Sequence, residues 1–365
     1  MGKKYVRMQE LEPDRQKKSK VISVMNNKGG CGKTSTAMAL GMYLARTGNN
    51  VLFWDGDPQS NLTQRLGIPD DLSIKRINML MKNPEDNEDI TQIMEYPYLQ
   101  RVPGSDSGIG VVGLIPGNHM SETEAKFLDT RFDDYQRATE KLIGHSSIVN
   151  YIQSIFDEKR KYFDYIILDT APALQGNTLN IVALKTTDEI IFPIDGLEAM
   201  AGIDEILDWM KGQTRHIKKP NGLFAMVKYQ ADTKEFDHSG NGHSNAVFRS
   251  MKKVFKDFVC NKGVKELRSM RLSKKSIPGF GGRTEYTALC KEIMEKISIP
   301  DRKNIFDYAE ENGAILSLEH EIATLSKMIV KRKPHRKIPR YVVTKNVENV
   351  ESVDNESIGN GKTIR

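Results

Sequence analysis

Length, composition and charge already exclude several classes of protein. The chain has 365 residues, 38% of them hydrophobic, and a formal net charge of +6, so it is long enough to bury a large core. No apolar run approaches the roughly 18 residues of a membrane-spanning helix, and no signal peptide is evident. The three cysteines, Cys31, Cys260 and Cys290, have neither metal-ligand spacing nor an even number, which favours a reducing, cytoplasmic compartment.

A phosphate-binding loop is predicted near the start of the chain. Residues 21–25 form a short apolar run typical of a buried strand, and residues 36–45 have the composition and spacing of a helix. Between them lies the string Asn26, Asn27, Lys28, Gly29, Gly30, Cys31, Gly32, Lys33, Thr34 and Ser35. Glycines in such a loop let backbone N–H groups turn towards phosphates, and a helix N-terminus favours their charge. Lys33 is expected to reach the β- and γ-phosphates of a nucleotide, and the Thr34 hydroxyl to ligate Mg²⁺.

Two acidic motifs follow. Residues 50–54 are predicted to form a second strand, which leads to D-x-D-P-Q-x-N-x-T with Asp55 and Asp57. A carboxylate beside a phosphate loop can orient a water or a Mg²⁺ ligand, although Asp and Pro also favour an ordinary turn. Residues 165–168 are four large residues that lead to Asp169, as in a strand buried on both faces. Asp169 is expected to hold Mg²⁺, and a structural Asp that caps the next element is the alternative.

Lys28 distinguishes this loop from the common G-x-x-x-x-G-K-[ST] pattern. The string K-G-G-x-G-K-[ST] resembles the deviant Walker A signature of the ParA/MinD class of P-loop ATPases, and the motif from Asp55 resembles the second motif of that class. The resemblance covers roughly residues 20–325 and is strong at three motifs. It implies ATP and Mg²⁺ as cofactors, and Lys28 in contact with the nucleotide of the other subunit in a dimer. It also implies that Asp57 acts in hydrolysis and contributes to the metal site, with Asp55 beside it.

Alternating strands and helices predict a doubly wound α/β domain. Further strands are expected over residues 110–115, 190–194 and 222–227. Together with the resemblance, they imply a mostly parallel sheet flanked by helices, the fold of P-loop NTPases of the deviant Walker A class.

The predicted ATPase domain spans residues 21–330, with insertions near 70–105 and 128–150. The first 20 residues form a basic extension that is expected to be flexible. Residues 331–365 are first basic and then polar, and they are expected to form a disordered tail.

Cations are concentrated in the C-terminal third of the chain. The stretch 211–283 is rich in Lys and Arg and poor in acids, and a second basic cluster covers residues 331–340. A charge run is usually a solvated face, but the resemblance implies binding of nonspecific DNA by this region once ATP has closed the dimer. Such a face neutralises several phosphates, so binding is sequence-independent and salt-sensitive. The residues assigned to DNA contact are Lys252, Lys253, Lys256, Arg268, Arg271, Lys274, Lys275, Arg283, Lys331, Arg332 and Lys333.

The sequence is therefore interpreted as that of a DNA partition ATPase. The resemblance implies weak intrinsic turnover, a ParB-like centromere-binding partner that stimulates hydrolysis, and a cytoplasmic protein associated with the nucleoid. Two alternatives stay open: a MinD-like membrane-associated positioning ATPase, and a ParA-like ATPase that positions a cargo other than DNA. The segment 322–330 has a weak apolar face and precedes a long tail, which argues against stable membrane association. A cargo-positioning relative would share every site residue.

Overall fold

The computed structural model describes most of the chain between Ser19 and Arg332. The described residues are 13, 19–68, 91–94, 108–117, 148–172, 178–213, 219–229, 243–265 and 284–332. Residue contacts divide the chain into one unit of residues 1–326 and another of residues 327–365, and the features described below belong to the first unit unless stated. Within the described part, no helix is long and apolar enough to cross a membrane.

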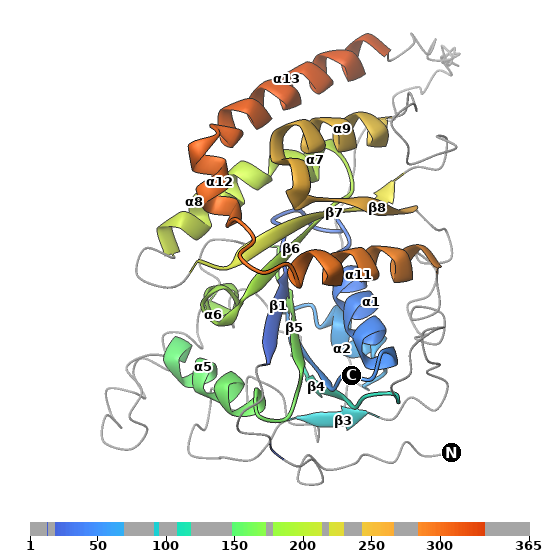
Figure 1. Ribbon diagram of the computed structural model, residues 1–365, viewed down its shortest axis with the longest axis vertical. Helices are drawn as coiled ribbons and strands as arrows, with labels where there is room; N and C mark the ends of the chain where they lie inside the picture. Colours follow the sequence, from blue (N-terminus) through green and yellow to red (C-terminus); the bar gives the residue numbers. More distant parts are fainter. Residues whose placement is uncertain are drawn as a thin grey trace, which may run out of the picture. The chain divides into compact units, whose positions relative to one another are not determined.

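An eight-stranded sheet forms the centre of the first unit (Figure 1). Its strands are β1 (Lys20–Val24), β2 (Val51–Gly56), β3 (Gln92–Met94), β4 (Val112–Ile115), β5 (Tyr165–Thr170), β6 (Glu189–Ile194), β7 (Asn221–Tyr229) and β8 (Val259–Lys265). Their order across the sheet is β3-β4-β2-β5-β1-β6-β7-β8. All neighbouring strands run parallel except β3 and β4, which are antiparallel. The prediction of a doubly wound, mostly parallel sheet is confirmed.

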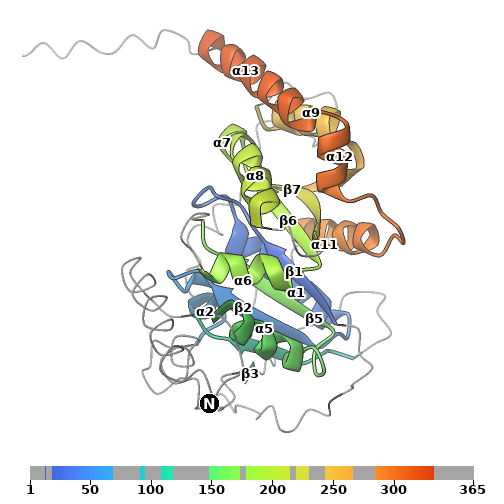
Figure 2. The same ribbon diagram turned by 90° about the vertical axis from the view of Figure 1, so that its left-hand side faces the viewer.

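Helices cover both faces of this sheet. They are α1 (Lys33–Arg46), α2 (Asn61–Arg65), α5 (Ile148–Lys159), α6 (Thr178–Thr186), α7 (Leu197–Ala201), α8 (Ile203–Gln213), α9 (His243–Phe255), α11 (Thr284–Ile297), α12 (Ile305–Glu311) and α13 (Ala314–Arg332), with the 3₁₀ helix η2 (Lys256–Phe258) after α9. Figure 2 shows α5 and α6 in front of the sheet, whereas α1 and α11 lie on its other side in Figure 1. From Lys327 on, α13 belongs to the second unit.

Two hydrophobic cores, one on each face, hold the sheet between its helices. Ile191 on β6 joins the core that contains Leu40 of α1 and Leu289 of α11. Its neighbours Ile190 and Phe192 join the other core, together with residues of α7, α8 and α9. Because successive side chains of a strand point to opposite faces, a strand covered on both sides needs an unbroken apolar run. This is why short apolar runs in the sequence mark the strands.

The strand order brings the C-terminal ends of β1, β2 and β5 to one edge of the sheet. From β1 the chain passes to β2 on one side, and from β5 it passes across β1 to β6 on the other side. In open α/β sheets, ligands bind where connections diverge in this way, outside the carboxyl ends of the strands. The loop after β1 therefore lies beside Asp55 and Asp57 of the β2 end and Asp169 of β5.

Two element boundaries near this edge differ from the predicted ones. α1 begins at Lys33, so the segment from Lys33 to Ser35 forms its first turn and does not belong to the loop. Asp169 lies inside β5, which ends one residue later at Thr170. The parallel neighbours β1 and β2 both extend hydrogen bonding to this position, and this pairing holds the carboxylate in the strand.

Other differences concern the tail and the insertions. α13 continues through Arg332, so Lys331 and Arg332 are helical where a flexible tail was expected. The first proline that would stop the helix is Pro334, two residues further on. Within the predicted insertion 70–105, β3 extends the sheet. The structure describes only residues 91–94 of that insertion. It also leaves undescribed most of the insertion 128–150 and nearly all of the first 20 residues.

Candidate functional site

The loop between β1 and α1 has the backbone shape of an anion cradle. Gly30 and Gly32 have positive φ angles of 76° and 103°, which glycine adopts most readily. Gly32 is the N-cap of α1 and provides no side-chain cap, so the N–H groups of the first helical turn remain suited to a phosphate. Gly29 and Gly30 are exposed, whereas Cys31 is fully buried in a hydrophobic core, which makes it a packing residue of the loop.

Lys33 lies over this loop and is only 6% exposed. Its Nζ donates a hydrogen bond to the Lys28 carbonyl oxygen at 3.0 Å. A lysine ammonium has three donors, so this bond leaves donors for phosphate oxygens. The positive charge of Lys33 also offsets part of the cost of burying Asp57 and Asp169. Lys33 therefore stands between the phosphate loop and the acidic side chains.

Lys28 is oriented by acids of the β6–α7 junction. Its Nζ forms ion pairs with Asp195 at 3.1 Å and Glu198 at 3.2 Å, and its backbone N–H donates to Asn26 Oδ1 at 2.8 Å. Partial burial disfavours the charged form of Lys28, but the hydrogen bonds and charges of the two acids outweigh this effect and raise its pKa. Lys28 is therefore a stable cation beside the loop at neutral pH.

Three carboxylates lie at the C-terminal edge of the sheet. Asp55 on β2 and Asp169 on β5 are register partners, and Asp57 follows two residues after Asp55. Asp55 is 1% exposed, Asp57 8% and Asp169 0%. Burial is the main cause that raises the pKa of all three, to about 6 for Asp55 and well above the ordinary range for Asp169. Repulsion from the neighbouring carboxylates adds to the shifts of Asp55 and Asp169, as expected at a site that a cation completes.

Asp55 and Asp57 have different surroundings. Asp55 Oδ2 accepts hydrogen bonds from the backbone N–H and the hydroxyl of Thr63, each at 2.7 Å. The Thr63 Oγ1 in turn accepts the Gly117 N–H at 2.9 Å. Asp57 Oδ1 accepts the Gln59 N–H at 2.9 Å and is the more exposed of the two acids. Asp55 therefore fixes the turn after β2, whereas Asp57 is better placed to meet a ligand.

The residues at this edge fit a magnesium ion that a nucleotide helps to hold. Both carboxylate oxygens of Asp169 lack a hydrogen bond of normal geometry among the described residues, although the Thr34 hydroxyl lies near enough to favour the charged form. Burying a carboxylate is costly unless a cation or donor accompanies it. In the described part, no group of three or more His, Cys, Asp or Glu side chains is arranged to hold a metal. Mg²⁺ usually takes one or two carboxylates and completes its shell with water and phosphates, which matches Thr34, Asp57 and Asp169.

Sequence reasoning missed three side chains of this site, which are Arg65, Asp195 and Glu198. It named Asn26 in the phosphate-binding string but gave it no role. Asn26 donates to the Pro193 carbonyl oxygen at 2.9 Å and accepts the Lys28 N–H, so it ties the loop to β6. Arg65 donates to Ser35 Oγ at 2.8 Å and links α2 to the first turn of α1. These contacts depend on the strand order, so no spacing in the sequence predicts them.

The described residues contain only part of the predicted DNA-contact set. Lys252 and Lys253 lie on α9 and Lys256 in η2, while Lys331 and Arg332 end α13 in the second unit. The other members lie outside the described residues: Arg268, Arg271, Lys274, Lys275, Arg283 and Lys333.

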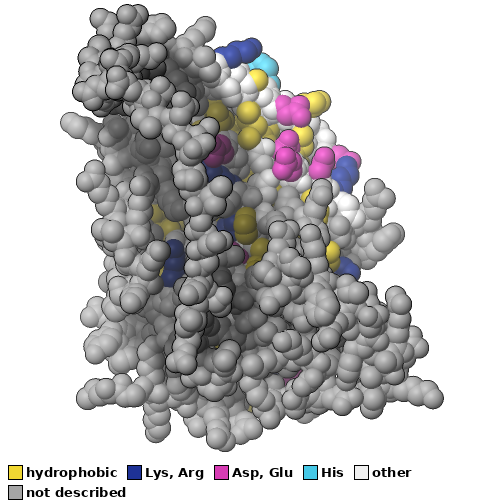
Figure 3. Space-filling model, turned by 180° about the vertical axis from the view of Figure 1, so that it is seen from behind, with side chains coloured by type: hydrophobic (Ala, Val, Ile, Leu, Met, Phe, Trp, Pro, Cys, Tyr) yellow, Lys and Arg dark blue, Asp and Glu magenta, His cyan; other side chains and the backbone are white. Residues whose placement is uncertain are grey.

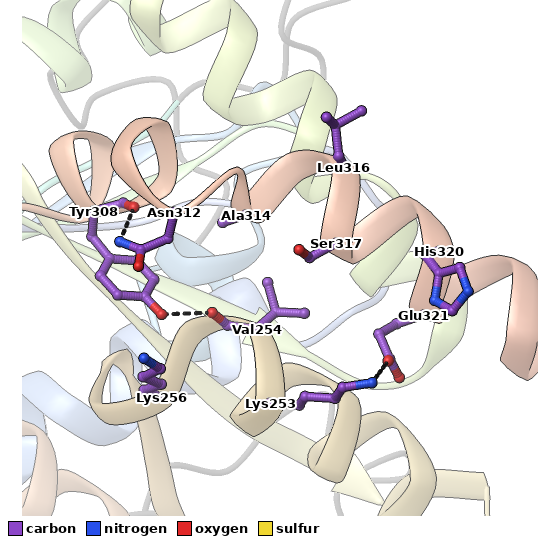
Figure 4. Close-up of a pocket in the computed structure, with 10 residues that line it drawn as sticks. All are labelled: Lys253, Val254, Lys256, Tyr308, Asn312, Ala314, Leu316, Ser317, His320 and Glu321. Atoms are coloured by element: carbon purple, nitrogen blue, oxygen red, sulfur yellow. Dashed lines mark hydrogen bonds and ion pairs between the residues drawn. The ribbon is translucent and has the colours of Figure 1, made fainter.

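Lys253 and Lys256 line a groove of about 450 Å³ between α9, η2, α12 and α13 (Figure 4). The Lys253 ammonium pairs with Glu321 at 2.5 Å, whereas Lys256 forms no ion pair with a described acid and is exposed. Lys252 is half-buried, and burial followed by repulsion from Lys296 lowers its pKa. Of these three lysines, Lys256 has the charge most available to an anionic partner.

Some cations of the basic stretch are neutralised by acids. Lys211 pairs with Glu310 and Lys219 with Asp307, each at 3.1 Å. On the face seen in Figure 3, acidic side chains stand beside basic and hydrophobic ones in the upper part of the described surface. The cations counted between residues 211 and 283 therefore do not all contribute to one positive face.

Comparison with known proteins decides the family. The family described as "AAA domain" matches residues 19–221, more than half of the chain. The chromosome partitioning protein ParA of Myxococcus xanthus is 27% identical over 292 residues, which cover 76% of this chain and 88% of that protein. The sporulation initiation inhibitor protein Soj of Bacillus subtilis is 26% identical over 285 residues, 75% of this chain and 98% of that protein. The chain belongs to the ParA/Soj family of AAA-domain ATPases.

Solved structures share the fold of this ParA/Soj family member. A McdA variant from Cyanothece in complex with ATP gives a TM-score of 0.55 at 19% identity, covering 79% of this chain and 100% of that one. Cobyrinic acid a,c-diamide synthase from Mycobacterium smegmatis with bound ADP and magnesium gives 0.53 at 18% identity, with 78% and 98% covered. A pNOB8 ParA bound to nonspecific DNA gives 0.50 at 20% identity, with 78% and 100% covered. At these identities the likeness establishes the fold.

Proposed function

We propose that this ParA/Soj family member is an ATP-dependent DNA partition protein of a plasmid or chromosome. ATP binding closes a homodimer that binds DNA without sequence preference, and hydrolysis releases the DNA. The proposal rests on the segment from Lys28 to Ser35, which comprises the loop and the first turn of α1. It lies beside three buried carboxylates, of which Asp169 lacks a regular hydrogen-bond partner in the described part of the chain. The name of the relative from Myxococcus xanthus, a chromosome partitioning protein, supports the biological role.

ATP is assigned to the loop between β1 and α1. Its phosphates meet the backbone N–H groups of the segment from Lys28 to Ser35 and the Lys33 ammonium. Thr34, Asp57 and Asp169 would hold Mg²⁺, which neutralises charge on the β- and γ-phosphates when bound. A protein of the same fold that holds ADP and magnesium supports this assignment.

Asp57 is assigned to the attacking water. It directly follows β2 and is more exposed than Asp55, so it is the better placed of the two acids to meet that water. Lys28 of each subunit is assigned to the nucleotide of the other, so that both sites are complete only in the dimer. Intrinsic turnover is slow, and a ParB-like centromere-binding partner accelerates it.

The DNA-binding face is assigned to the basic region around α9 and to the cations that follow it. Exposed Lys256 and its neighbours supply phosphate contacts, which position DNA without reading its sequence. A ParA of the same fold bound to nonspecific DNA supports this assignment. The protein is accordingly assigned to the cytoplasm, in association with the nucleoid and without stable membrane binding.

Co-sedimentation tests this function against the membrane alternative. The purified protein is mixed with long duplex DNA or with anionic liposomes, in the presence of ATP, ADP or no nucleotide. Pelleting with DNA only when ATP is present is the expected result, and Lys33→Ala should abolish it. ATP-dependent pelleting with liposomes in place of DNA would refute the proposal and establish a membrane cycle.

A further inference from the structure

We propose that Asp195 and Glu198 form a latch, which holds Lys28 within its own subunit until a second ATP-bound subunit takes it over. The inference rests on the proposed function, because it concerns the lysine that is assigned to the partner's nucleotide. It adds two positioning residues and a regulatory step. Subunit closure must break these contacts before the two sites are complete.

The latch is defined by three short contacts to one ammonium group. Lys28 Nζ lies 3.1 Å and 3.3 Å from the two carboxylate oxygens of Asp195 and 3.2 Å from Glu198 Oε2. The backbone of Lys28 is fixed as well, because its N–H donates to Asn26 and its carbonyl oxygen accepts from Lys33. Both ends of the residue are therefore held, and contact with a second subunit requires the side chain to leave two acids.

The charges and the exposure of these side chains favour contacts that can break during closure, and not a permanent support of Lys28. Two carboxylates surround one ammonium, and the Lys28 side chain is 27% exposed, that of Asp195 15% and that of Glu198 83%. When Lys28 departs, Asp195 loses a partner while it is largely buried, and such a group is costly to leave unpaired. Glu198 is solvated and loses little. Asp195 therefore supplies most of the resistance, and Glu198 tunes it.

The latch also lies next to the helix that carries predicted DNA contacts. Glu198 belongs to the first turn of α7, and α7 packs against α9. Ala199 and Met200 of α7 share a core cluster with Met251 and Val254 of α9. A movement of α7 on release of Lys28 would thus reach Lys252 and Lys253 through direct packing.

The test is ATP-driven dimer formation by latch variants. Asp195→Asn, Glu198→Gln and the double variant are compared with the unmodified chain by analytical ultracentrifugation, with Mg²⁺ and a non-hydrolysable ATP analogue. Loss of a partly exposed ion pair changes an equilibrium by up to about five-fold. Within this range, we expect release of one latch to change the dimer dissociation constant by about three-fold. Each dimer releases two latches, so this factor is squared. The dimer dissociation constant of the double variant should fall by about ten-fold.

Asp204→Asn is the matched control. Asp204 lies on the neighbouring helix α8, and its carboxylate accepts the Glu205 N–H, whereas Lys28 pairs with Asp195 and Glu198. Because Asp204 is not part of the latch, its replacement should not change the dimer dissociation constant. Binding of a fluorescent ATP analogue to the monomer is measured for every variant, and Asp204→Asn should leave it within about two-fold, so that a change in dimer formation is read apart from a change in nucleotide binding.

The outcomes separate the latch from the function on which it rests. A dimer of unchanged or lower stability in both single variants would overturn the latch and make the two acids supports of Lys28. If the unmodified chain binds ATP but forms no dimer at any concentration, the proposed dimer cycle and the latch both fail. If it binds no ATP, the nucleotide assignment itself is wrong and the latch falls with it.

Discussion

Neutralising Asp55 should stabilise the nucleotide-free protein, although the residue lies at the candidate active site. Burial raises the pKa of Asp55 to about 6 from the ordinary value of 3.8, and this difference corresponds to about 3 kcal/mol against the charged form. In Asp55→Asn, the amide oxygen can still accept from Thr63, but the amide nitrogen replaces the oxygen that accepts the Asp57 N–H at 3.3 Å, and the loss of that hydrogen bond costs about 1 kcal/mol. A net gain in unfolding free energy of about 2 kcal/mol is expected at pH 7.5.

The sign of the pH dependence provides the stricter test. The pKa of Asp55 is higher in the folded chain than in the unfolded chain. The contribution of its protonated carboxyl to the free energy of unfolding is therefore fully present below about pH 4 and is lost as the pH rises through about 6. The gap between Asp55→Asn and the unmodified chain should therefore open between these values and stay constant above them.

Urea unfolding followed by circular dichroism, without nucleotide from about pH 4 to 8, measures this gap. Thr63→Val serves as the companion variant, since it removes a donor that favours the charged carboxylate and should destabilise the protein at pH 7.5. A variant Asp55→Asn that is less stable than the unmodified chain by the same amount at every pH would refute the reasoning.

Four further outcomes are expected. Lys33→Ala should abolish binding of a fluorescent ATP analogue, and full affinity would contradict its role. Asp57→Ala should slow ATP hydrolysis by about 10²-fold or more and trap a dimer on DNA, whereas unchanged turnover would assign the water to another group. Gly41→Val should cost about 1–3 kcal/mol in urea unfolding, because a Cβ there would lie 2.2 Å from Phe53 Cζ, while Gly212→Ala, with open space around it inside α8, should stabilise the protein by up to about 1 kcal/mol. Lys256→Asn, which tolerates the local φ of 47°, should lower the salt slope of DNA binding by about 1, more than Lys253→Ala does, because Glu321 already neutralises Lys253.

The sheet and the phosphate loop could be predicted because their signals are local. Residues 190–194 form an apolar run that only a strand covered on both faces needs, and the glycines of the loop mark backbone angles that other residues avoid. The tail was predicted to begin at residue 331, but α13 continues through Arg332. Helix boundaries depend on the last stabilising contact and not on composition.

The contacts that shape the site could not be predicted, because they join distant parts of the chain. Lys28 and Asp195 are 167 residues apart, and they meet only because β1 and β6 are neighbours in the sheet. Likewise, the cations of the C-terminal third could be counted, but the pairing of Lys253 with Glu321, 68 residues further on, depends on how α9 packs beside α13. Charge along a sequence therefore overstates the charge that a surface presents.

The central claim is that ATP switches this chain into a state that binds DNA through its phosphates. The most direct measurement is the affinity of the purified protein for nonspecific duplex DNA with ATP, with ADP and without nucleotide, at several salt concentrations. We expect binding only in the presence of ATP. The logarithm of the binding constant should then fall linearly with the logarithm of the salt concentration, with a slope of about −0.9 for each phosphate contacted. Equal affinity in all three nucleotide states, or no binding in any of them, would contradict the claim.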